Sequence, residues 1–256
     1  MENIILMMNI KIIKVNFLTY LFVFLIIYSG YINYLIHFLI VFIFHELGHI
    51  FFAKLFNIKI LKIEIFPYGG MIKLNKKLNV EIYKDFLIAA GGFIFQFILL
   101  VINLLFIKNN LLNYINKLIF IMNVIPVIPL DGSKLFFIFL SKYLPYYQSL
   151  KLFYLLDILF LLLIITYGFF MGNLNVSYII FCFCSFIIQV KAKDYRLNSF
   201  YLERYLYSFP FKKIKYQTKN DIHFLKREEK SFFYDNNWKS EKEILTKKFD
   251  NCSEFW

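Results

Sequence analysis

The stretch that decides the fold is Phe44-His45-Glu46-Leu47-Gly48-His49-Ile50, a His-Glu-x-x-His motif inside an apolar run. On a helix, positions four apart lie on one face, so His45 and His49 can offer two imidazole nitrogens to one metal ion. Glu46 follows the first histidine and points beside the metal, which suits a general base acting on water rather than a ligand. The motif therefore predicts a zinc-dependent hydrolase.

The surroundings of the motif are those of a membrane span. Between residues 34 and 56 the only charged or imidazole side chains outside the motif are His37 and Lys54, near the two ends. At roughly 1.5 Å per residue, this segment would cross about 30 Å of hydrocarbon. A chance motif on a packing face is the alternative, but ionisable residues inside a membrane are costly and usually mark functional cavities. We therefore predict a metal site within the membrane, about 10–15 Å from its cytoplasmic surface.

The composition excludes an ordinary soluble domain, because 60% of the 256 residues are hydrophobic and 21% are aromatic. We predict an all-α polytopic membrane protein of about six spans, with a short membrane-associated β-hairpin and a small cytoplasmic C-terminal tail. The start of the chain lacks the basic segment and the cleavage site of a signal peptide. The three cysteines indicate neither a disulfide framework nor a second metal site. The predicted spans are 16–33, 34–56, 86–107, 112–130, 150–170 and 174–190.

The net charge of +12 has a topological explanation. Lysine and arginine fall mainly on the connections 57–85 and 131–149 and on the tail, which carries 15 basic and 10 acidic residues. The positive-inside rule then places these segments and both termini in the cytoplasm. A nucleic-acid-binding patch is the weaker alternative, so we expect no direct nucleic-acid partner. We predict a membrane-embedded metalloprotease core at 1–190 and a cytoplasmic tail at 191–256.

A β-hairpin is predicted directly after the motif-bearing span. Residues 58–66 alternate and are rich in β-branched side chains, Pro67-Tyr68-Gly69-Gly70 forms a turn, and residues 71–74 form a second strand. Proteases bind substrates in extended form, and an exposed strand edge can pair with a substrate strand. A purely structural re-entrant loop is an equal alternative.

The third metal ligand is sought at the end of the fourth predicted span, which reads Asn123-Val124-Ile125-Pro126-Val127-Ile128-Pro129-Leu130-Asp131-Gly132. Two prolines three apart break a helix, which membranes tolerate only beside protein or a cavity. A catalytic zinc takes three protein ligands and keeps one open position. Asp131 is the best-placed third ligand, and a helix-end carboxylate in an Asp-Gly turn is the alternative.

Other polar and small residues inside the spans have structural interpretations. Gly91 and Gly92 open the third span and are expected to serve close helix packing rather than chemistry. Gln96, on the same span, is expected to hydrogen-bond to a neighbouring helix. Asp157, in the fifth span, is expected to face a cytoplasmic cavity or to pair with Lys151, and we do not assign it to the metal.

At these residues the chain resembles the site-2 protease family of intramembrane zinc metalloproteases (peptidase M50), and within it the branch that processes sporulation sigma factors. The resemblance covers nearly the whole chain, including residues 44–50, 66–70, 123–145 and 200–205. It implies that His45, His49 and Asp131 hold one catalytic Zn²⁺ and that Glu46 is the catalytic glutamate.

The resemblance also implies a substrate and partners. Members of this branch remove the N-terminal pro-segment of a membrane-associated sigma factor, pro-sigma-K, in the mother-cell membrane around the forespore. Membrane inhibitors that resemble stage IV sporulation protein FA and BofA are implied as partners, and a homo-oligomer stays open. The tail resembles a shortened CBS domain, a module that would bind ATP. The expected substrate-binding residues are Asn123, Pro126, Pro129, Pro67, Gly69 and Gly70.

We therefore predict a zinc endopeptidase that cleaves a membrane-associated protein near the cytoplasmic face. One alternative is an inactive, protease-derived membrane scaffold that sequesters a partner, against which the intact ligand set argues. The other alternative is a divalent-metal transporter. A transporter would need polar residues on a path across the bilayer, whereas the intramembrane charges here gather toward one side.

Overall fold

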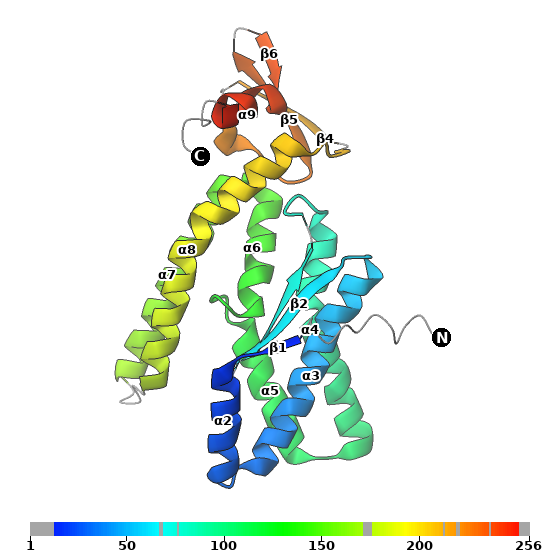
Figure 1. The fold of residues 1–256 in the computed structure, drawn as a ribbon, viewed down its shortest axis with the longest axis vertical. Helices are drawn as coiled ribbons and strands as arrows, with labels where there is room; N and C mark the ends of the chain where they lie inside the picture. Colours follow the sequence, from blue (N-terminus) through cyan, green and yellow to red (C-terminus); the bar gives the residue numbers. More distant parts are fainter. Residues whose placement is uncertain are drawn as a thin grey trace. The chain divides into compact units, whose positions relative to one another are not determined.

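The computed structural model describes residues 13–66, 69–75, 77–170, 176–211, 213–218, 221–235 and 237–250. Within these ranges the protein is mainly helical, with two three-stranded sheets (Figure 1). The chain forms two compact units. The first consists of Met1–Lys76 and Leu87–Met122, and the second of Lys77–Phe86 and Asn123–Trp256.

The first unit contains the motif helix. Its helices are α2 (Phe17–Tyr28), α3 (Ile32–Leu55), most of α4 (Ile82–Ile102), the π-helical turn η2 (Asn103–Ile107) and most of α5 (Asn110–Val124). The α3 helix ends in a Schellman motif, because Asn57 adopts a φ of 55° and the N–H of Ile58 donates to the carbonyl oxygen of Ala53 at 2.8 Å. Asparagine tolerates this left-handed conformation, so the sequence ends the helix just before the hairpin.

The sheet of the first unit is the predicted hairpin with one added strand. Strand β1 (Ile13–Val15) runs parallel to β2 (Ile60–Phe66), which pairs antiparallel with β3 (Gly69–Leu74). Lys62 donates a hydrogen bond to the Glu64 carboxylate on β2, and this is the main cause that lowers the pKa of Glu64. The turn residues 67–68 lie outside the described residues.

Helices α3 and α4 touch through their backbones. A Cβ atom at Gly48 would lie 2.1 Å from the carbonyl oxygen of Gly91, and a Cβ at Gly91 would lie 2.5 Å from the carbonyl oxygen of Gly48. Any side chain at either position would push the helices apart. The predicted packing role is therefore present at Gly91, and its partner is the glycine of the motif itself.

The second unit consists of three helices followed by a small α/β tail. The helices are α6 (Asp131–Tyr143), α7 (Tyr146–Phe170) and α8 (Val176–Leu206), of which α7 and α8 lie side by side (Figure 1). In the tail, β4 (Lys213–Gln217) is parallel to β5 (Glu229–Asp235), and β5 is antiparallel to β6 (Asn237–Ser240). The tail is completed by η3 (Ile222–Phe224) and α9 (Glu241–Asp250), which packs on β5 and β6.

The tail shares its core with the helices. Leu225, Phe233 and Leu245 join one buried cluster with residues of α7 and α8, in which the rings of Tyr146 and Phe200 stack with centroids 3.8 Å apart. Helix α8 extends to Leu206. It runs without a break across residue 190. The boundary that we predicted there between the membrane core and the tail stays a prediction.

Three described helices are long and apolar enough to cross a membrane, namely Ile32–Leu55, Ile82–Ile107 and Tyr146–Phe170. The apolar helix α2 is shorter, with 12 residues. The fourth predicted span, 112–130, ends early because α5 stops at Val124, before the two prolines. The sixth, 174–190, begins in residues outside the described ranges, so the count of six spans stays a prediction.

The segment 131–149, which we interpreted as a cytoplasmic connection, folds mainly as helix α6. Asp131 is its first residue, and an acidic side chain in the first turn favours a helix start through the helix dipole. Helix α7 begins soon after α6 ends, so little of this segment is loop. The Asp131-Gly132 turn that we considered as the alternative is thus a helix N-terminus.

Two buried ion pairs hold the tail within the second unit. Arg204 of α8 contacts Glu241 of α9 at 2.9 Å, with side-chain exposures of 1% and 9%. Arg204 also donates to the carbonyl oxygen of Glu229 at 2.8 Å. Arg227 contacts Asp85 at 2.6 Å and donates to the carbonyl oxygen of Val80. These contacts attach the tail to α8 and to the segment that enters α4.

Removing the Arg204 side chain should detach α9 from α8. Arg204→Ala would leave the Glu241 carboxylate buried without its cationic partner, which costs about 3–5 kcal/mol. We expect a lower thermal midpoint in detergent and faster tryptic cleavage within residues 213–250. Lys242→Ala, at an exposed position of α9, is the control and should behave as wild type. An Arg204→Ala protein with the wild-type midpoint and digestion rate would contradict this assignment.

Candidate active site

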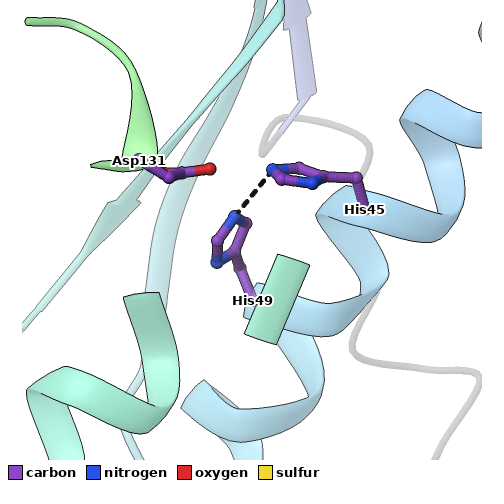
Figure 2. A group of neighbouring side chains, drawn as sticks. All are labelled: His45, His49 and Asp131. Atoms are coloured by element: carbon purple, nitrogen blue, oxygen red, sulfur yellow. Dashed lines mark hydrogen bonds between the residues drawn. The ribbon is translucent and has the colours of Figure 1, made fainter. Parts of the chain in front are cut away.

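The two motif histidines face each other on α3. Both side chains are buried, with 4% and 8% exposure, and their rings meet edge to face with centroids 4.8 Å apart. The Nε2 atoms of His45 and His49 are 3.1 Å apart, and the dashed line in Figure 2 marks this contact. The four-residue spacing therefore directs both Nε2 atoms to one point.

Helix α4 orients each ring through its other nitrogen. The Nδ1 atom of His49 lies 2.7 Å from the carbonyl oxygen of Ile88, and that of His45 lies 3.1 Å from Oε1 of Gln96. A carbonyl oxygen can only accept, so both Nδ1 atoms carry the proton in these contacts. With Nδ1 engaged in this way, Nε2 is the nitrogen of each ring that is left to bind a metal ion. This is the arrangement in which acceptors behind the ring prepare a histidine for a metal.

The spacing of the Nε2 atoms fits a zinc ion. With Zn–N distances of about 2.0–2.1 Å and tetrahedral angles, two ligand nitrogens are about 3.3 Å apart. The buried pair therefore has the chemistry and nearly the separation of two corners of a zinc site.

Asp131 is the third member of the group. Its side chain is 6% exposed, and its Oδ1 atom accepts a hydrogen bond from Lys134 at 2.7 Å. The candidate ligand atoms of His45, His49 and Asp131 all lie within 4.8 Å of one another (Figure 2). Within the described ranges, these three residues are the group of histidine, cysteine or acidic side chains that could hold a metal ion. Two imidazoles and a carboxylate are a donor set that catalytic zinc accepts.

Glu46 lies against the hairpin. A Cβ atom at Gly70 of β3 would lie 2.7 Å from both Cδ and Oε1 of Glu46. The carboxyl group therefore occupies the space that a side chain at residue 70 would fill. Gly69, the other described residue of the expected substrate-binding turn, has a φ of 153° and borders an apolar cavity between α2 and α3. Pro67 lies outside the described residues.

The other expected substrate-binding residues lie in the connection that leads to Asp131. Asn123 is in the last turn of α5, and Pro126 and Pro129 follow in the loop. The start of α6 packs closely against this segment, because a Cβ at Gly132 would lie 2.3 Å from the carbonyl oxygen of Val124. The role of the three residues in substrate binding stays a prediction.

Two residues have site roles that the sequence analysis missed. A Cβ at Gly92 would lie 2.4 Å from Cε1 and 2.6 Å from Nε2 of His45, so this glycine makes room for the ring rather than for a helix. Gln96 holds the same ring through Nδ1, so the hydrogen bond that we expected between Gln96 and a neighbouring helix is present, and its partner is His45 of α3. The sequence signal that could have linked the two residues is their spacing. Residues 92 and 96 are four apart and therefore share one face of α4. Nothing in the sequence indicated that this face meets His45.

Residues 33–112, which contain α3, the hairpin and the glycine-rich start of α4, match the model of Peptidase family M50. The resemblance to the site-2 protease family is confirmed. Stage IV sporulation protein FB of Bacillus subtilis is 27% identical over 188 residues, which cover 69% of this chain and 65% of that protein. A zinc metalloprotease of Methanocaldococcus jannaschii is 31% identical over 119 residues, which cover 42% of this chain and 34% of that protein.

A solved structure, the site-2 protease from Methanocaldococcus jannaschii, matches over 70% of this chain and 89% of that chain, with 25% identity and a TM-score of 0.49. The matched region spans less than two thirds of either curated relative.

Two glycine substitutions should affect zinc binding and the action of Glu46 differently. Gly92→Ala places a methyl group on the His45 ring and should weaken zinc binding at least about tenfold. Gly70→Ala displaces only the flexible end of Glu46, so zinc should remain while turnover falls about 100-fold. Zinc content and peptide cleavage of each purified variant are the measurements. Equal effects of both substitutions on zinc would contradict the separate roles.

Gln96→Ala should weaken the metal site without touching a ligand. The Nδ1–H group of His45 would lose its buried acceptor, and losses of this kind typically cost 10–100-fold in metal affinity. Competition with a chelator measures the effect. The exposed neighbour Phe97, changed to Leu, serves as the control on the same helix. If Gln96→Ala retained zinc as tightly as Phe97→Leu, Gln96 would not orient the ligand.

Proposed function

We propose that this protein is an intramembrane zinc metalloendopeptidase. The observation that carries the proposal is the pair of buried histidines whose Nδ1 atoms are held by α4 and whose Nε2 atoms meet 3.1 Å apart. Both Nε2 atoms are thereby directed to one place, as two imidazole ligands of one metal ion are. The match to Peptidase family M50 over the same helix supports this chemistry.

The residues divide the work of peptide hydrolysis. His45, His49 and Asp131 would hold the zinc ion. When bound, the ion lowers the pKa of a water molecule toward about 7 and polarises the scissile carbonyl. Glu46 takes a proton from the attacking water and then delivers it to the leaving amine. Gln96 and the carbonyl group of Ile88 keep both imidazoles in the metal-binding tautomer.

The hairpin offers a strand edge at which the substrate can bind. Strand β3 is an edge strand of its sheet, since the strand order is β1-β2-β3. An extended peptide paired to this edge would run beside Gly70, against which Glu46 lies. We propose that Gly69 and Gly70, with Pro67, take part in binding there, and that Asn123, Pro126 and Pro129 contact the substrate from the other segment.

The biological substrate is proposed from similarity. Stage IV sporulation protein FB shares 27% identity with this chain, which favours a sporulation role and removal of the pro-segment of pro-sigma-K. The membrane would then be that of the mother cell around the forespore, with both termini in the cytoplasm. Inhibitors that resemble stage IV sporulation protein FA and BofA, a homo-oligomer and ATP binding at the tail are further proposals of the same origin.

Glu46→Gln should abolish cleavage and leave the metal in place. The substitution keeps the shape of the side chain and all three ligands but removes the group that accepts the proton. Co-expression with the pro-sigma factor of the host, followed by gel analysis of product size, measures cleavage, while metal analysis counts zinc per chain. Processing at the wild-type rate in Glu46→Gln would overturn the mechanism. Zinc binding without cleavage in wild type would instead redirect the search to another substrate or a missing partner.

A further inference from the structure

A buried carboxyl group that the proposed chemistry does not use lies in the middle of α7. Asp157 is 1% exposed, although α7 is one of the three helices apolar and long enough to cross a membrane. Such a group is expensive in an apolar environment unless its oxygens have partners. The identity of those partners indicates what it does.

Asp157 joins a loop to a helix. Its Oδ1 atom accepts a hydrogen bond from the backbone N–H of Ile128 at 3.0 Å. Its Oδ2 atom accepts a hydrogen bond from the side-chain amide of Gln189 on α8. The sequence suggested a cavity or Lys151, and the structure shows these two partners instead.

The N–H group of Ile128 donates to a side chain, whereas two other N–H groups of the loop donate to carbonyl oxygens of the loop itself. Val127 donates to the carbonyl oxygen of Ile125, and Leu130 donates to that of Val127, both at 2.8 Å. Pro126 and Pro129 have no N–H group. The side chain of Ile128 is 4% exposed, so an unpaired amide there would be costly. The Asp157 carboxylate is what satisfies it.

The loop also determines where α6 begins. Ile128 lies three residues before Asp131, the first residue of α6. On the far side of Asp131, Gly132 packs directly under the carbonyl groups of Val124 and Ile125. Asp131 is therefore fixed on both sides. The residue after it, Gly132, is in close backbone contact, and the loop before it is held by the hydrogen bond from the Ile128 amide to Asp157.

We infer that Asp157 is a positioning residue that sets the place of the Asp131 carboxylate for metal binding. The inference rests on the proposed function, because it takes Asp131 as a zinc ligand. Asp157 touches neither metal nor substrate, and it acts through the Ile128 amide and the short loop that follows it. Loss of its acceptor should weaken zinc binding even though all ligands remain.

We expect asparagine at position 157 to support zinc binding almost as well as aspartate does. The amide side chain introduced by Asp157→Asn would keep an oxygen for the Ile128 N–H group and turn its NH₂ group toward Gln189. The Oε1 atom of Gln189 is buried without a hydrogen-bond partner, so a flip of this amide would accept the new donor. Asp157→Asn should therefore bind zinc within about threefold of wild type, whereas Asp157→Ala should lose about tenfold or more.

The test is a double-mutant cycle in zinc affinity. Wild type, Asp157→Ala, Asp131→Ala and the double variant are purified in detergent, and the monodisperse fraction of each is titrated by chelator competition. If Asp157 acts through Asp131, adding Asp157→Ala to Asp131→Ala should change zinc affinity no further. Ser149→Ala, a buried α7 position that bonds only to nearby carbonyls, is the control for general loosening of the helix.

Each outcome decides the question. A loss in Asp157→Ala that disappears in the Asp131→Ala background, with Asp157→Asn near wild type, supports the positioning role. An affinity equal to that of Ser149→Ala, or an equal loss in both backgrounds, overturns it. If Asp157→Ala gives no monodisperse protein, Asp157→Glu replaces it, and an unchanged zinc affinity in that variant overturns the role. A wild-type protein without zinc would refute the proposed function itself.

Discussion

The first unit depends on two hydrogen bonds that join α3 to α4. Imidazoles buried in apolar surroundings must satisfy their N–H groups, and both do so on α4, at the Ile88 carbonyl oxygen and at Gln96. The bonds are short enough only because Gly48 and Gly91 bring the helix backbones into contact. The same contacts select the tautomer, so the packing of α3 on α4 also orients both imidazoles.

Glycines make room for the reactive side chains at three further places. Gly92 leaves space for the His45 ring, Gly70 for the Glu46 carboxyl group, and Gly132 for the close approach of α6 to the end of α5. In each case the missing Cβ is what admits the neighbour. A chain with only nine glycines among 256 residues thus uses several of them at the site rather than in turns.

The sequence alone predicted several features that have a local signature. The spacing of His45 and His49 indicated a shared face, the alternation after residue 58 indicated the hairpin, and two prolines indicated the break before Asp131. Features that depend on contacts between distant residues were missed. His45 and Gln96 are 51 residues apart, and Ile128 and Asp157 are 29 apart, so no periodicity connects them. Helix α6 was also missed, because the Asp-Gly pair indicates a turn when the preceding packing is unknown.

Several buried polar side chains of this apolar chain use the backbone as their partner. His49 bonds to the carbonyl oxygen of Ile88, Asn116 to that of Gln96, and Asp157 to the amide of Ile128. A helical carbonyl oxygen retains a second lone pair after its helix bond, so it can accept from a side chain without unwinding the helix. A broken helix adds free amides as well. An apolar chain can therefore hold its buried polar side chains with few polar partners, provided that its helices approach closely at glycines and break where a carboxylate can accept from the freed amide.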